Sequence, residues 1–102
     1  RQKLIDIIDQ SSSDSILFIS GDRHRGGLYQ LTSASGKNII EMTSSSLNLS
    51  FTNDEEAGPL RDGPTFVQEN YGEILLDKQS NKLTVNLKDN QGTIIQTVSL
   101  NQ

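Results

Sequence analysis

The stretch Lys82-Leu83-Thr84-Val85-Asn86-Leu87-Lys88 alternates strictly between polar and apolar residues. Side chains of a β-strand point alternately to opposite faces of a sheet. Leu83, Val85 and Leu87 should therefore share a buried face, while the residues between them face water. Short polar turns and further apolar segments flank this stretch on both sides. We therefore expect residues 71–100 to form a three-stranded antiparallel meander.

The first third of the chain shows two other patterns. Leu4, Ile5, Ile7 and Ile8 have helical spacing, so residues 1–10 are expected to form an amphipathic helix. Ile16-Leu17-Phe18-Ile19 is a continuous apolar run without alternation, which predicts a strand buried on both faces. We expect this strand to be the most buried of the protein.

Two further strands are expected at residues 28–32 and 38–43. Residues 48–69 are rich in Asn, Asp, Gly and Pro, which predicts one long loop. Together these elements predict a single, mostly β unit of the α/β or α+β class spanning residues 1–102.

Composition excludes several classes of function. The 102 residues include 9 basic and 13 acidic side chains, giving a net charge of −4, so no nucleic-acid-binding surface is expected. Cysteine is absent and there is one histidine, which excludes disulfides, thiolate metal sites and a multi-histidine metal centre within this chain. No apolar run approaches the roughly 18 residues of a membrane span, and no signal peptide is recognisable.

The candidate site lies in residues 16–24, where the apolar strand ends at Gly21 and is followed by Asp22 and His24. Ligand sites in open α/β sheets lie just past the carboxyl ends of strands. On an extended backbone, side chains two residues apart point to one side, and carboxylate with imidazole suits Zn, Fe or Mn. From these residues alone, an ordinary Asx-type turn with a surface histidine is the more common outcome.

The order of four segments resembles a known family. Ser20-Gly21-Asp22-Arg23-His24 resembles the Ser-Gly-Asp-x-His motif of alkaline phosphatase D (PhoD-like) metallophosphatases, in the calcineurin-like phosphoesterase superfamily. The opening helix, the Glu41–Leu47 segment and Asn70-Tyr71-Gly72 with the following meander resemble, in the same order, the family's helix, its Glu-x-Thr-Ser-Ser segment and its closing strands.

The resemblance implies a fold and a chemistry. It implies the C-terminal portion of a two-sheet metallophosphoesterase sandwich that holds two metal ions (Fe, Ca, Zn or Mn). The complete enzyme would hydrolyse phosphate mono- or diesters through a metal-activated water. His24 matches the family's metal-ligating histidine, and Asp22 stands where related enzymes have the first histidine of a Gly-His-x-His motif. Secretion or export to the periplasm is implied in the same way.

Several side chains near the motif have a plainer interpretation. Arg23 and Arg25 could attract an anionic phosphate, although solvated loop cations are more common. Thr43, Ser44 and Ser45 could line a pocket, but turn or capping roles are more common for such residues. Acidic residues 54–56 and Asp62 are expected to face solvent.

The sequence also departs from the family. The family's upstream motifs, which carry an early Asp, a bridging carboxylate and an Asn/His/Asp segment, have no counterpart in residues 1–15. We therefore expect a C-terminal part, inactive alone, whose partner is the missing N-terminal part of the same protein. The strand at 16–19 would then keep an open edge. The alternative is a non-catalytic, β-rich binding or interaction module.

Overall fold

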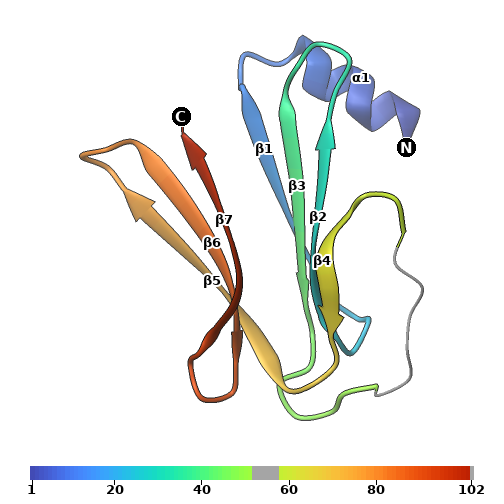
Figure 1. The fold of residues 1–102 in the computed structure, drawn as a ribbon. Coiled ribbons are helices and arrows are strands. Elements are labelled where there is room, and N and C mark those ends of the chain that lie inside the picture. Colours follow the sequence, from blue (N-terminus) through green and yellow to red (C-terminus); the bar gives the residue numbers. More distant parts are fainter. Residues whose placement is uncertain (52–57, 102) are drawn as a thin grey trace.

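The computed structural model describes residues 1–51 and 58–101 and is mostly β, with two sheets and one short helix (Figure 1). The helix α1 spans Gln2–Gln10, within the expected residues 1–10. The strands are β1 (Ser15–Ser20), β2 (Gly26–Thr32), β3 (Asn38–Ser44), β4 (Arg61–Phe66), β5 (Asn70–Asp77), β6 (Lys82–Asp89) and β7 (Ile94–Asn101).

The first sheet, sheet A, has the strand order β1-β3-β2-β4. Strand β1 pairs with β3 in parallel, whereas β2 is antiparallel to both β3 and β4. The chain therefore leaves β1 at one edge, returns in β2, and inserts β3 between them. Among the described strands, β1 and β4 are therefore the two edge strands of sheet A, and β1 pairs with β3 alone.

The second sheet, sheet B, is the expected antiparallel meander, in the order β5-β6-β7. In β6, Val85 and Leu87 are buried and Leu83 is half-buried, which confirms the buried face predicted from the alternation. The expectation that the residues between them face water is wrong for Asn86, which is 2% exposed and donates a hydrogen bond to Glu73. Ile94 is exposed, because the pairing of β6 with β7 shifts register between Leu87 and Lys88.

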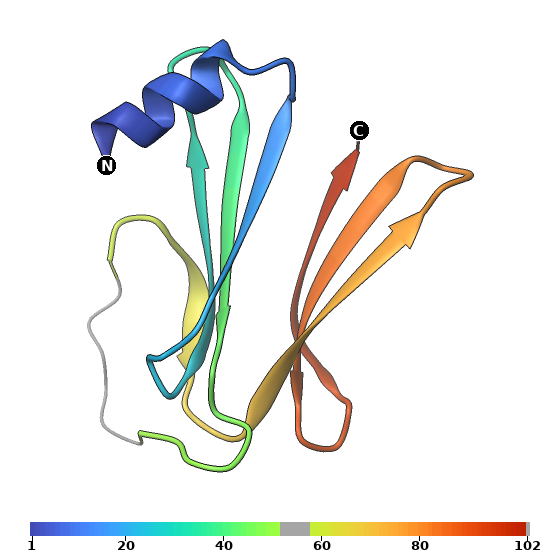
Figure 2. The same ribbon diagram turned by 180° about the vertical axis from the view of Figure 1, so that it is seen from behind.

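The core lies between the two sheets. Leu28, Met42 and Val85 form its centre, and Leu17, Leu83 and Val98 pack around them. The sheets meet at one end of the strands and diverge toward the other, as both views show (Figures 1 and 2). Gly26 allows the close approach, because a Cβ there would lie 2.8 Å from a methyl carbon of Leu87.

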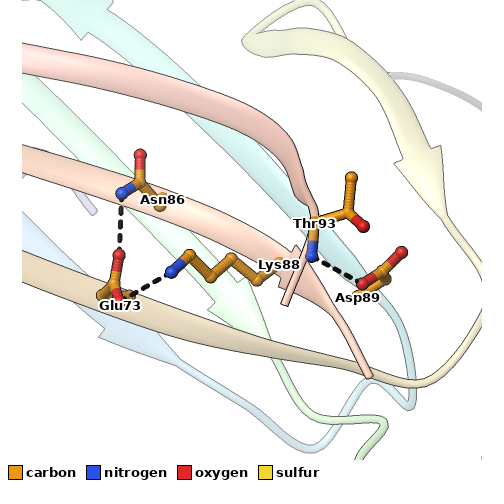
Figure 3. Close-up of polar contacts among 5 residues, drawn as sticks. All are labelled: Glu73, Asn86, Lys88, Asp89 and Thr93. Carbon is orange, nitrogen blue, oxygen red and sulfur yellow. Dashed lines mark hydrogen bonds and ion pairs between the residues drawn. The ribbon is translucent and has the colours of Figure 1, made fainter. Parts of the chain in front are cut away.

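The outer face of sheet B carries a charged cluster (Figure 3). Glu73 accepts hydrogen bonds from Asn86 Nδ2 at 2.9 Å and from Lys88 Nζ at 2.8 Å. The hydrogen bond from Lys88, followed by that from Asn86, lowers the pKa of Glu73 below its usual value. The same hydrogen bond raises the pKa of Lys88. This face is polar enough to meet water without a covering layer.

Strand β1 is not the most buried strand, contrary to the expectation. Its residues are half-buried or exposed, and Ile19 is 67% exposed. The reason is its place at the edge of sheet A. The more deeply buried strands are β2 and β3 in sheet A and β6 in sheet B.

Residues 48–69 were expected to be one loop, but β4 lies within them. Gly63 and Pro64 suggested a loop, since both residue types are uncommon inside strands and proline cannot donate to a ladder. In the structure, Gly63 has a φ of 74°. Both are accommodated because β4 is an edge strand whose pairing with β2 is irregular.

The helix α1 covers one end of sheet A, on the face away from sheet B (Figure 2). Between α1 and this face runs an apolar groove of about 310 Å³, lined mainly by side chains of α1, β1, β2 and β3. No helix among the described residues is long and apolar enough to cross a membrane.

Candidate functional site

The loop that joins β1 to β2 holds both predicted ligands. Asp22 and His24 have φ angles of 69° and 52°, in the left-handed region. The backbone is therefore coiled there, and the argument from an extended chain, in which alternate side chains share a side, does not apply to this pair. Asp and His are among the non-glycine residues that enter this region most readily.

His24 is held by the segment that follows β3. Its Nδ1 lies 3.0 Å from the carbonyl oxygen of Leu49, and its own carbonyl accepts a hydrogen bond from the Phe51 amide at 3.0 Å. Its ring also stacks on Phe51, with ring centroids 4.4 Å apart and an interplanar angle of 19°. Three contacts therefore fix a half-buried imidazole on an otherwise irregular loop.

These contacts define which ring nitrogen of His24 carries the proton. A carbonyl oxygen only accepts, so Nδ1 must donate to Leu49. In a neutral ring, Nε2 then keeps its lone pair. Histidines that bind metals typically donate their other ring N–H to a backbone carbonyl or carboxylate in this way. The ring is therefore prepared to ligate through Nε2.

Asp22 lies in the same loop with its side chain exposed. Within residues 1–51 and 58–101, no three His, Cys, Asp or Glu side chains come close enough together to hold a metal ion. The apolar groove beside α1 is lined by neither Asp22 nor His24. That the two predicted ligands face one cleft stays a prediction.

The two loop arginines differ from each other. Arg23 is exposed, as expected for a loop cation. Arg25 is buried, at 7% exposure, and its Nε donates a hydrogen bond to the Arg23 carbonyl at 3.2 Å. The expectation of a solvated cation is therefore wrong for Arg25, which helps to hold the loop closed.

The hydroxyl residues at the end of β3 hold structural elements together. The Ser20 hydroxyl lies 2.7 Å from Glu41 Oε1 and 2.9 Å from Thr43 Oγ1, which links β1 to β3. The Ser44 hydroxyl donates to Asn70 Oδ1 at 2.8 Å, which links β3 to β5. These hydroxyls link neighbouring strands, a role that differs from the turn or capping role expected for them and from pocket lining.

Asn70 is a key residue that pattern analysis treated only as part of a resemblance. It is 2% exposed, its Nδ2 donates to the Gln68 carbonyl at 2.7 Å, and its amide donates to the Ser46 carbonyl at 2.9 Å. Its side chain therefore fastens the end of sheet A to the start of sheet B. An asparagine beginning a strand after a Gln-Glu pair gave no signal of this role.

Of the acidic residues expected to face solvent, Asp62 is exposed on β4 and accepts a hydrogen bond from the Gln30 side chain. Asp54, Glu55 and Glu56 lie outside the described residues.

Comparisons with protein-family models, with curated proteins and with solved structures found no match to this chain. The resemblance to PhoD-like phosphatases therefore depends on the order of the four sequence segments.

Proposed function

We propose that this chain is the C-terminal part of a metal-dependent phosphoesterase, and that His24 is one of its metal ligands through Nε2. The observation that carries this proposal is the hydrogen bond from His24 Nδ1 to the Leu49 carbonyl. It fixes the ring and its tautomer just past the carboxyl end of the edge strand β1, in the motif that resembles the family's ligand loop.

The remaining roles follow from the same proposal. Asp22 would supply a carboxylate oxygen to the same metal ion. Since no three His, Cys, Asp or Glu side chains cluster among the described residues, further ligands must come from residues outside those described. When bound, a metal pair of this kind lowers the pKa of a water and neutralises phosphoryl oxygens. Arg23, exposed in the same loop, would add positive charge for a phosphate ester.

The tautomer can be tested directly, because His24 is the one histidine of the chain. Two-bond ¹H–¹⁵N correlation spectra of the neutral ring should show an unprotonated Nε2 and a protonated Nδ1. Added Zn²⁺ should shift the Nε2 resonance, weakly in this chain alone. A ring protonated at Nε2, or a zinc titration that leaves Nε2 unchanged at millimolar metal, would contradict the proposal.

Activity gives the second test. The 102-residue chain should hydrolyse neither p-nitrophenyl phosphate nor its diester above background with Zn²⁺, Mn²⁺, Fe²⁺ or Ca²⁺. The chain extended with the residues encoded upstream should hydrolyse one of them, and His24→Asn should abolish that activity. Asparagine is chosen because it tolerates the left-handed backbone at this position. Asp6→Asn, on the exposed face of α1, is the control and should leave activity unchanged.

A further inference from the structure

The segment that follows β3 meets His24 in the pattern of a parallel strand pair. The Phe51 amide donates to the His24 carbonyl at 3.0 Å, and His24 Nδ1 donates to the Leu49 carbonyl at 3.0 Å. In parallel pairing, a residue accepts from one amide of its neighbour strand and donates its own amide to the carbonyl two residues before that amide. Here the ring N–H takes the place of the backbone amide as donor. Only a ring protonated at Nδ1 can therefore complete this bridge.

Other contacts hold the backbone of the loop on both sides of His24. The Arg23 carbonyl accepts a hydrogen bond from Arg25 Nε at 3.2 Å, and the Arg25 carbonyl accepts one from the Ser45 hydroxyl at 3.5 Å. The path of the loop thus has contacts that do not involve Phe51. The rotation of the imidazole ring, in contrast, depends on residues 49 and 51.

Phe51 restricts that rotation from one face of the ring. The two rings are nearly parallel, with centroids 4.4 Å apart and an interplanar angle of 19°. A partial rotation of the imidazole about its Cβ–Cγ bond would break this stack. A half turn would keep the rings parallel but would place a ring carbon of His24, instead of Nδ1, at the Leu49 carbonyl.

The stack leaves the second ring nitrogen of His24 uncovered. The lone pair of a neutral imidazole nitrogen lies in the plane of the ring, whereas a stacked neighbour covers the face of the ring. With the proton on Nδ1, the lone pair belongs to Nε2. Phe51 therefore holds the ring without covering the atom that would bind a metal.

Burial gives the segment that carries Phe51 little hold of its own. Leu47, Leu49 and Phe51 are 73%, 57% and 48% exposed with respect to the described residues. The bridge and the stack with His24 therefore contribute much of its attachment to the rest of the described chain. Both contacts lie within this chain, so they hold whatever else covers the outer side of the segment.

We propose that Phe51 is a positioning residue, which holds His24 in the Nδ1-protonated tautomer and keeps Nε2 as the free ligand atom. A consequence, which rests on the proposed function, concerns the metal. Metal binding at Nε2 and attachment of residues 49–51 require the same tautomer, so each should strengthen the other. Such coupling between two binding events is reciprocal.

The tautomer can be measured without a metal. Phe51→Leu removes the stack but keeps the amide at this position, and Phe51→Tyr keeps both. In two-bond ¹H–¹⁵N spectra of the neutral ring, Phe51→Leu should move the Nδ1 and Nε2 resonances toward each other, the sign of mixed tautomers. Phe51→Tyr should match the parent chain. A merely structural Phe51 would lower Tm without changing the tautomer of the folded chain.

The matched control is Leu47→Ala, at an exposed position of the same segment. It should leave the tautomer of His24 unchanged.

A Zn²⁺ titration tests the coupling. Phe51→Leu should weaken zinc binding about threefold to tenfold, the range expected for the loss of one aromatic pair. Phe51→Tyr and Leu47→Ala should bind zinc as the parent chain does. In the parent chain, zinc should slow the exchange of the Phe51 amide with D₂O.

An unchanged tautomer in Phe51→Leu would overturn the proposal. Equal changes in Leu47→Ala and Phe51→Leu would also overturn it, because the effect would then not come from the stack. A parent chain that binds no zinc would contradict the proposed function alone, since the tautomer measurement decides the role of Phe51 without metal.

Discussion

Sheet B and sheet A are assembled from contacts of very different range along the chain. In sheet B, each strand pairs with its neighbour in the sequence through a short turn. In sheet A, β1 pairs with β3 across the whole of β2, and β4 joins β2 after a long connection. The comparison shows that local signals are enough to build an antiparallel meander, whereas a mixed sheet depends on packing between distant segments.

The turns of sheet B show how local chemistry fixes its register. Asp77 Oδ1 accepts from the Gln79 amide at 2.9 Å, and Asp89 Oδ1 accepts from the amides of Gln91 and Thr93 at 2.9 and 2.8 Å. Figure 3 shows the Asp89–Thr93 contact at the end of β6. These are Asx-type interactions, which favour a turn without help from the rest of the fold.

Among the substitutions that test this comparison, Leu87→Ala should lower the free energy of unfolding the most. Leu87 is fully buried in β6 and packs against Gly26 of sheet A, so its loss leaves a cavity between the sheets. Chemical denaturation should show a loss of about 2–5 kcal/mol in the free energy of unfolding. Leu75→Ala, at a 51% exposed position of β5, is the control and should cost less than about 1 kcal/mol. Equal losses would mean that the sheets do not share one core.

Asn70→Ala should have an intermediate effect, because it cuts the polar link between the sheets. Ser44 would lose the acceptor of its hydroxyl, and the Gln68 carbonyl would lose a donor. Removing one partner of buried hydrogen bonds costs about 1–3 kcal/mol. Asn38→Ala, at an exposed position of β3, should change stability by less than about 0.5 kcal/mol. A neutral result for Asn70→Ala would show that packing alone joins the sheets.

Asp89→Asn should have the smallest effect, and one that depends on pH. The hydrogen bond from the Thr93 amide, with that from Gln91, lowers the pKa of Asp89 below its usual value. A carboxyl with a lowered pKa contributes stability above its unfolded pKa and loses it as the pH falls through its folded pKa. Thermal unfolding should therefore show a lower Tm for the variant at pH 7, and the difference should vanish as the pH falls well below about 4.

The control for this measurement is Asp6→Asn, on an exposed face of α1. It should change Tm little at either pH. If Asp89→Asn and the parent chain stayed equally far apart at low and neutral pH, the turn carboxylate would not be the source of the difference.

The candidate site could be predicted only in part from the sequence. The motif located Asp22 and His24 at the end of β1, because a glycine and polar residues mark where an apolar strand stops. It could not supply the contacts of His24 with Leu49 and Phe51, since these join residues about 25 positions apart in the chain. The burial of Arg25 was also missed.

The sequence by itself determined the meander, its buried face and the helix, because each depends on periodicity and turn chemistry within a few residues. Only the tertiary structure decided that β1 lies at an edge, that β4 pairs despite Pro64, and that Asn70 joins the two sheets. Strand order and burial depend on which distant segments pack together. An apolar run such as residues 16–19 is equally compatible with a central strand and with an edge strand.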